Sequence, residues 1–232
     1  MIRNLVEDGQ KELEFISKSV SRPPYLMLGC GGSISTKIGS DLMVMGELKY
    51  NVKNGGKNSG CVVINYKNIR TYYSMVDIKL DIDFDKVNDI LIRQNTVQKY
   101  SMLQKHNDTL QIFLEAGFHS LLDTYVIHTH SAYANILGCG DSGEELMCNI
   151  FSDEDLDCFW IPCSEPGFLM TYLIKEAMER NYKNADYKPR VFFLENHGLI
   201  VTSENMQKAI DTSMMVNSRI KQYFQINEQH IC

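Results

Sequence analysis

The length, composition and charge of the chain fit an ordinary globular protein and exclude several other classes. Apolar residues make up 44% and charged residues 22% of its 232 residues, so a core can form without disulfides or a structural metal. The formal net charge of -6 argues against nucleic acid and anionic membrane as main partners. No stretch resembles a membrane span, and seven cysteines without a CxxC pair indicate reduced thiols in a cytoplasmic protein. We expect one domain over residues 1–232.

The first third of the chain is predicted to contain one helix followed by short strands. Apolar residues at helical spacing predict a helix from Leu5 to Val20. Short apolar runs then alternate with glycine-rich or polar turns. These elements are a strand at Tyr25–Leu28, the turn Gly29–Gly32, strands at Ser33–Lys37 and Asp41–Met45 joined at Gly39-Ser40, a polar loop at Asn51–Gly60 and a strand at Cys61–Ile64.

The remaining two thirds are predicted to alternate helices with strands. The helices are expected at Phe84–Lys105, Thr109–Leu122, Glu144–Phe151, Pro166–Arg180 and Glu204–Phe224. The strands are expected at Thr124–Thr129, Cys158–Ile161, Arg190–Leu194 and Leu199–Thr202. Strands paired by hairpins, with helices on the faces, predict an α/β layered domain with a mainly antiparallel sheet.

The most informative motif is a pair of histidines in one predicted strand, with a third histidine later in the chain. The pair lies in Val126-Ile127-His128-Thr129-His130, and the third is His197, in Glu195-Asn196-His197-Gly198. Side chains alternate along a strand, so His128 and His130 point the same way. Three neutral imidazoles with an open position are the usual catalytic zinc arrangement. A single HxH pair can arise by chance, but with His197 the pattern predicts a zinc site.

Two further features lie close to this motif in the sequence. Glu115 and His119 are four residues apart on a predicted helix, so they share a face. A carboxylate near a catalytic zinc can carry protons, although an exposed helical glutamate is the simpler interpretation. We expect His119 to be a hydrogen-bonded histidine in the protein interior rather than a metal ligand. The turn from Gly29 to Ser33 could offer backbone N–H groups to an anion, although most glycine-rich turns are only turns.

Four longer segments of the sequence occur together and in a fixed order. They are Gly-Gly-Ser-Ile-Ser at 31–35, Leu-Glu-Ala-Gly-Phe-His at 114–119, Val-Ile-His-Thr-His-Ser-Ala-Tyr-Ala at 126–134 and Glu-Asn-His-Gly-Leu-Ile-Val at 195–201. With these motifs the chain resembles the class II aldolase/adducin family from Tyr25 to about Thr202. The resemblance implies a three-layer α/β/α subunit with a mixed, largely antiparallel central sheet. It also implies a homo-oligomer, typically a tetramer, with active sites between subunits.

The same resemblance assigns roles to particular residues. His128, His130 and His197 match the zinc ligands, and Glu115 matches the catalytic acid/base. His119 matches a position that is often histidine in the family and is not itself a ligand. The substrate-binding residues are expected to be Gly31, Gly32, Ser33 and Gly46.

The chain departs from the family where the phosphate-binding members hold a phosphate group. Ser33 stands where those members usually have asparagine, Met45 replaces the serine of a Ser-Gly pair, and Phe113 or Leu114 replaces another serine. Apolar side chains cannot compensate the desolvation of a phosphate dianion. The substrate therefore lacks a terminal phosphate, carries its charge elsewhere, or binds it through Gly31, Gly32, Ser33 and Lys49.

The leading hypothesis is a zinc-dependent lyase of the aldolase type. It would act on a small carbohydrate-like hydroxy-ketone through a metal-stabilised enediolate. A tyrosine from a neighbouring subunit would assist, with Tyr133, Tyr172 and Tyr223 as the first candidates. The alternatives are an epimerase, dehydratase or decarboxylase on the same metal site, and a non-catalytic interaction module like the adducin head. A purely structural zinc is disfavoured, because closed structural sites usually contain cysteine.

Overall fold

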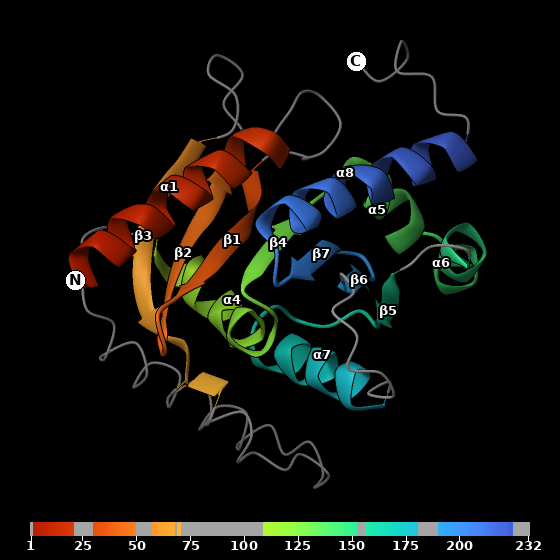
Figure 1. Cartoon of the computed structure of the whole chain (residues 1–232). Helices are drawn as coiled ribbons and strands as arrows, with labels where there is room; N and C mark the ends of the chain where they lie inside the picture. Colours follow the sequence, from red (N-terminus) through yellow and green to blue (C-terminus); the bar gives the residue numbers. More distant parts are fainter. Residues whose placement is uncertain are drawn as a thin grey trace, which may run out of the picture.

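In the part of the chain that the computed structural model describes, seven strands form one mixed sheet (Figure 1). The structure describes residues 2–20, 30–49, 57–67, 69–70, 109–152, 156–180 and 190–224. The order across the sheet is β3 (Lys57–Asn65), β2 (Leu42–Lys49), β1 (Cys30–Ile38), β4 (Tyr125–Thr129), β7 (Gly198–Ser203), β6 (Arg190–Leu194) and β5 (Asp157–Ile161). Every neighbouring pair is antiparallel except β5 and β6, which are parallel.

Helices cover both faces of the sheet, so the predicted three-layer α/β/α class with a mixed, largely antiparallel sheet is confirmed (Figure 1). One layer contains α1 (Ile2–Val20), α5 (Ala132–Gly138), α6 (Gly143–Phe151) and α8 (Met206–Tyr223). The opposite layer contains α4 (Thr109–Leu121) and α7 (Phe168–Arg180). None of the helices in the described part of the chain is long and apolar enough to cross a membrane.

Strand β4 lies in the middle of the sheet and is covered on both faces. Ile127 packs in the apolar cluster under α1 and α8, whereas Val126 packs on the other face with Phe118 of α4. Because side chains alternate along a strand, His128 shares the face of Val126. Its ring meets the Phe118 ring edge-on, with 5.8 Å between centroids. The fold therefore places a polar imidazole inside an apolar layer, where it needs a polar partner.

The predicted helices and strands that fall on described residues are present, with small differences at their ends. The predicted strand at Tyr25–Leu28 and the predicted helix at Phe84–Lys105 lie outside the described residues. The loop predicted at Asn51–Gly60 is partly wrong, because Lys57 to Gly60 belong to β3. Lys57 pairs with Lys49 in the register of β2, so backbone pairing extends this strand beyond its apolar run.

Helix α5 was not predicted from the sequence. It follows β4 directly and begins after Ser131, whose side-chain oxygen accepts a hydrogen bond from the backbone N–H of Ala134 at 3.3 Å. Serine at this position satisfies one of the free N–H groups at a helix start, and this is the signal that could have revealed the helix. Strand β4 therefore ends at Thr129, and the chain passes through His130 and Ser131 into helix α5.

Candidate metal centre and active site

The three predicted histidines converge at one edge of the sheet. His128 is the fourth residue of β4, His130 follows the end of that strand, and His197 lies in the turn between β6 and β7. The antiparallel pairing of β4 with β7 sets Thr129 opposite Leu199 and so brings this turn against the histidine pair. One ring nitrogen from each histidine lies within 4.8 Å of the other two. The Nε2 atoms of His130 and His197 are 3.1 Å apart.

The turn that carries His197 needs the residues on either side of it. Asn196 has a φ of 57°, a left-handed conformation that asparagine tolerates better than most residues. A Cβ on Gly198 would lie 2.5 Å from the backbone oxygen of Thr129 and 3.3 Å from the His130 ring. Only glycine lets the turn approach β4 so closely. The Asn-His-Gly sequence therefore positions the third imidazole through backbone geometry.

The electrostatic state of the three imidazoles fits metal coordination. Burial holds the pKa of His128 and His130 below the ordinary imidazole value, and burial together with His130 lowers the pKa of His197 to about 4. The neutral ring is the form that binds a metal ion. His128 Nδ1 lies 3.2 Å from the backbone oxygen of Leu199 and can donate its hydrogen there. That tautomer leaves a lone pair on Nε2.

The donor atoms themselves also fit a divalent ion. Within the described part of the chain, the buried Nε2 of His128 has no hydrogen-bond partner. A buried nitrogen without a partner is costly unless something absent from the polypeptide satisfies it. In a tetrahedral zinc site with bonds of about 2.0–2.1 Å, nitrogens lie about 3.3 Å apart. The 3.1 Å between His130 and His197 is close to that separation. Three imidazoles without cysteine match an open, catalytic zinc site.

Helix α4 delivers the predicted acid/base to the same place. Glu115 is only 3% exposed, and its Oε1 lies 3.7 Å from Nε2 of His128. Ser33 of β1 donates a hydrogen bond to the other carboxylate oxygen, Oε2. Burial raises the pKa of the Glu115 carboxyl to about 7; the Ser33 hydrogen bond opposes this rise and the charge of Glu47 adds to it. A carboxyl with a pKa near 7 can both accept and donate a proton at neutral pH.

The residues predicted to bind substrate lie on β1 and β2. Gly31, Gly32 and Ser33 belong to β1, which is the neighbour of β4, and Ser33 pairs with His128. Gly46 of β2 pairs with Ile34, whose side chain packs in the cluster under α1. By strand alternation Gly46 faces α1, so only its backbone could contribute to a site on the opposite face. A substrate-binding role for these four residues stays a prediction.

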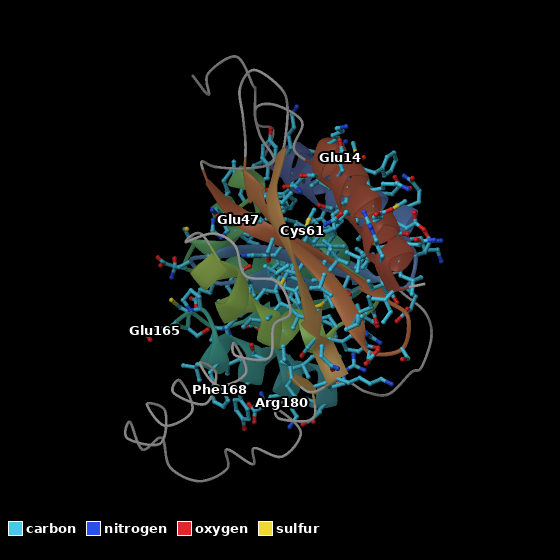
Figure 2. The ribbon with its side chains drawn as sticks, turned by 90° about the vertical axis from the view of Figure 1, so that its left-hand side faces the viewer. Glu14, Glu47, Cys61, Glu165, Phe168 and Arg180 are labelled. Carbon is cyan, nitrogen blue, oxygen red and sulfur yellow. The ribbon has the colours of Figure 1, made fainter. Side chains whose placement is uncertain are left out.

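Sequence reasoning missed Glu47, a second acidic residue beside the site. Glu47 follows Gly46 on β2 and pairs with Ser33, so it faces the α4 layer. Figure 2 shows it on the side of the sheet away from α1, and its side chain is buried, with 7% exposure. Its spacing of two residues from the apolar Met45 indicates only that the two side chains share one face of a strand, and the register that sets Glu47 opposite Ser33 comes from the structure.

We predict that Gly32→Ala lowers the free energy of unfolding by about 2–4 kcal/mol. Gly32 has a φ of 116°, and a Cβ there would lie 2.5 Å from the backbone oxygen of His128. Urea unfolding of the purified variant measures the loss. Gly39→Ala is the matched control, because Gly39 has a φ of 60° but the nearest atom to its added Cβ is 3.7 Å away. Equal losses in the two variants would contradict a close contact between Gly32 and β4.

Comparison with known proteins identifies the class of protein. The sequence model of the class II aldolase and adducin N-terminal domain matches residues 80–224, which is more than half of the chain. The chain therefore belongs to this family. Membership supports an aldolase-like or related enzyme, and class II aldolases typically use a divalent metal ion, for which the histidine cluster is a candidate site.

Individual relatives extend the comparison. The N-terminal class II aldolase domain of a conserved Thermoplasma acidophilum protein is 19% identical, with a TM-score of 0.63, and the match covers 92% of each chain. A sugar-phosphate aldolase from Thermotoga maritima is 10% identical, with a TM-score of 0.53, over 97% of this chain and 95% of that one. These likenesses show the fold. The curated relative YuxG of Bacillus subtilis (strain 168), named an uncharacterized oxidoreductase, is 24% identical over 121 residues. That match covers 51% of this chain but 16% of YuxG.

Proposed function

We propose that the protein is a zinc-dependent lyase that breaks or forms a carbon–carbon bond in a small carbohydrate-like hydroxy-ketone. His128, His130 and His197 would hold the ion, and Glu115 would be the acid/base. The observation that supports this proposal is the convergence of three neutral imidazoles and one buried carboxyl with a pKa near 7 at one edge of the sheet. We further propose that residues 1–232 form one domain and that the protein works in the cytoplasm.

In this proposal each residue has a separate task. The three imidazoles would hold a divalent ion, which when bound would supply Lewis acidity toward negative charge on substrate oxygens. The backbone oxygen of Leu199 keeps His128 in the tautomer with a free Nε2. The Oε1 atom of Glu115 lies 3.7 Å from that nitrogen. It would carry the proton to and from the substrate carbon that becomes nucleophilic. The apolar layer around Phe118 excludes water from the buried side of the site.

A neighbouring subunit of a homotetramer would complete the site with a tyrosine. Of the three candidates, Tyr133 is buried in the cluster under α8, with 4% exposure. The hydroxyl of Tyr172 donates to Glu176 on the same helix at 2.8 Å. Tyr223, at the end of α8, is 50% exposed and is the candidate best able to reach another subunit.

Epimerases, dehydratases and decarboxylases would use the same metal and carboxylate. Product analysis therefore has to accompany every activity assay, because release of two carbonyl fragments identifies a lyase of the aldolase type. A non-catalytic module would have no need for the neutral imidazoles and the buried carboxyl that converge here. We therefore do not favour the adducin-like alternative.

We predict that substrates without a terminal phosphate are preferred to fuculose 1-phosphate and rhamnulose 1-phosphate. The Ser33 hydroxyl is already bound to Glu115, Met45 is fully buried among apolar side chains, and Glu47 adds negative charge nearby. A buried phosphate short of hydrogen bonds costs a few kcal/mol, or about two decades in binding. Comparison of kcat/KM for each ketose with and without its phosphate, with added zinc, measures the preference.

Glu47→Gln provides the control for this prediction. It removes one negative charge while keeping the shape of the side chain. It should therefore raise kcat/KM for the phosphorylated substrates relative to that for the free sugars. A clear preference of the wild-type protein for phosphorylated substrates would contradict the prediction. Backbone N–H groups at Gly31 and Gly32 would then be the phosphate-binding groups.

A further inference from the structure

We propose that His119 is a positioning residue that acts on Glu115 through Ser33. In this proposal Ser35, His119, Ser33 and Glu115 form one hydrogen-bond chain that runs in a single direction and fixes the Oε2 atom of the carboxylate. The catalytic purpose of the chain rests on the proposed function, but its existence and direction do not.

The contacts of His119 form an unbroken path between β1, which carries the hydroxyls of Ser33 and Ser35, and α4, which carries Glu115. His119 Nδ1 lies 2.7 Å from the Ser35 hydroxyl, and Nε2 lies 2.7 Å from the Ser33 hydroxyl. The Ser33 hydroxyl in turn binds Oε2 of Glu115. All four side chains are buried, with exposures of 0% for Ser35 and His119, 2% for Ser33 and 3% for Glu115. Stacking on Phe118, at 4.7 Å between ring centroids, holds the imidazole plane.

The number of hydrogens in the chain determines its direction. The structure has the Ser33 hydroxyl donating its one hydrogen to Oε2 of Glu115, and this direction applies above pH about 7, where the carboxyl has lost its proton and can only accept. The Ser33 oxygen must therefore accept from His119, which places the ring hydrogen on Nε2. Burial lowers the pKa of His119 well below the ordinary value, so the ring is neutral and Nδ1 has a lone pair. Ser35 then donates its hydrogen to Nδ1.

This direction assigns different tasks to the two oxygens of Glu115. Oε2 is held by Ser33, whereas Oε1 is left facing His128 Nε2 at 3.7 Å. Oε1 is therefore the oxygen that meets the substrate. The Ser33 hydroxyl has its hydrogen and an acceptor site in use, so it offers no donor to a substrate group. The serine that stands in place of asparagine would thus orient the carboxylate and would not bind phosphate.

Nitrogen NMR of the zinc-supplied 232-residue protein with labelled histidine, recorded above pH about 7 so that Glu115 is ionised, tests the hydrogen-bond chain without any substrate. The signals of His119 are identified by their loss in His119→Gln. We expect Nε2 of the wild-type ring to appear as a protonated nitrogen and Nδ1 as an unprotonated one. Ser33→Ala removes the acceptor of the Nε2 hydrogen and should move the ring toward the other tautomer, while Ser33→Thr keeps the hydroxyl and should restore the wild-type pattern.

A second variant tests whether the chain connects His119 to Glu115. If His119 acts on Glu115, the coupling must also run from Glu115 to His119. Glu115→Ala frees the Ser33 hydrogen to point at Nε2, so the tautomer of His119 should shift. Ser120→Ala is the matched control, because Ser120 is also fully buried on α4 but donates to the backbone oxygen of Gly117. We expect it to leave the His119 signals unchanged.

Two results would overturn the proposal. One is a wild-type ring that carries its hydrogen on Nδ1, a measurement that requires no variant to fold. The other is a His119 tautomer that responds to Glu115→Ala no more than to Ser120→Ala. Both outcomes are independent of catalysis, so a failure of the proposed lyase activity would be recognised separately, by metal analysis and product assays.

Discussion

Purified protein is expected to carry about one zinc-like divalent ion per chain, and His128→Ala is expected to lose it. His128 is fully buried within the cluster of three imidazoles, and its unpartnered Nε2 lies 3.7 Å from Oε1 of Glu115. Loss of a group that only orients a ligand commonly weakens metal binding about 10–100-fold. Removal of a ligand should cost at least the upper end of that range. Metal analysis after dialysis against a weak chelator measures the occupancy.

The other histidines make this experiment specific. His197→Ala should also lose the ion, because its imidazole is 3.1 Å from that of His130. His119→Gln is the control, since both ring nitrogens of His119 face serine hydroxyls and neither is available to an ion. Full retention of metal in both His128→Ala and His197→Ala would reject the site. If only the His119→Gln variant lost the metal, the ion would have to bind nearer to β1 than the three imidazoles.

The residues alone predicted an α/β layered domain and the convergence of the histidines, and the family resemblance implied the three-layer form, for identifiable reasons. The motif around His128 and His130 lies in a short strand, where alternation fixes the direction of side chains. The antiparallel pairing of β6 with β7 sets the Asn-His-Gly turn, and the pairing of β7 with β4 brings His197 to the same edge. Alternation and the turn are local backbone geometry, which single residues can reveal, whereas the pairing of β7 with β4 joins distant segments of the chain.

Features that depend on packing between distant segments were not predictable in the same way. Glu47 reaches the site only because β2 pairs with β1 in a register that sets it opposite Ser33. The two serine contacts of His119 depend equally on how α4 lies against β1. A periodic pattern identifies the strands but does not set their register, so these contacts required the assembled sheet.

Glu115→Gln is expected to keep the fold and the metal but to lose activity by about a hundredfold or more, the usual scale for a removed general acid/base. The amide has nearly the shape of the carboxyl but cannot exchange a proton at Oε1, the oxygen next to His128. The assay uses a substrate whose cleavage by the wild-type protein has been established by its products. Metal analysis of the same sample separates loss of the acid/base from loss of the ion. Near wild-type turnover would reduce Glu115 to a structural carboxylate.

The same substitution has a consequence for stability that requires no substrate. An ordinary glutamate carboxyl titrates near 4.5, whereas burial raises the pKa of Glu115 to about 7. The folded chain therefore holds this proton more tightly than the unfolded chain. The resulting stabilisation is complete below pH about 4.5 and is lost as the pH rises through about 7. Glu115→Gln carries no such proton, so its stability relative to metal-free wild-type protein should rise by about 3 kcal/mol across this interval.

Urea unfolding of both metal-free proteins between pH about 4.5 and 8 measures this difference. The comparison cancels the contributions of other titrating groups, including the three neutral imidazoles, where these are the same in both proteins. Glu14→Gln is the control, because Glu14 lies exposed on α1 (Figure 2) and its hydrogen bond to Lys18 lowers the pKa of its carboxyl. Its relative stability should therefore change in the opposite direction and by a smaller amount. A Glu115→Gln difference that stays constant across the range would mean that the carboxyl titrates as an ordinary one, and the physical reason for assigning it proton transfer near neutral pH would be lost.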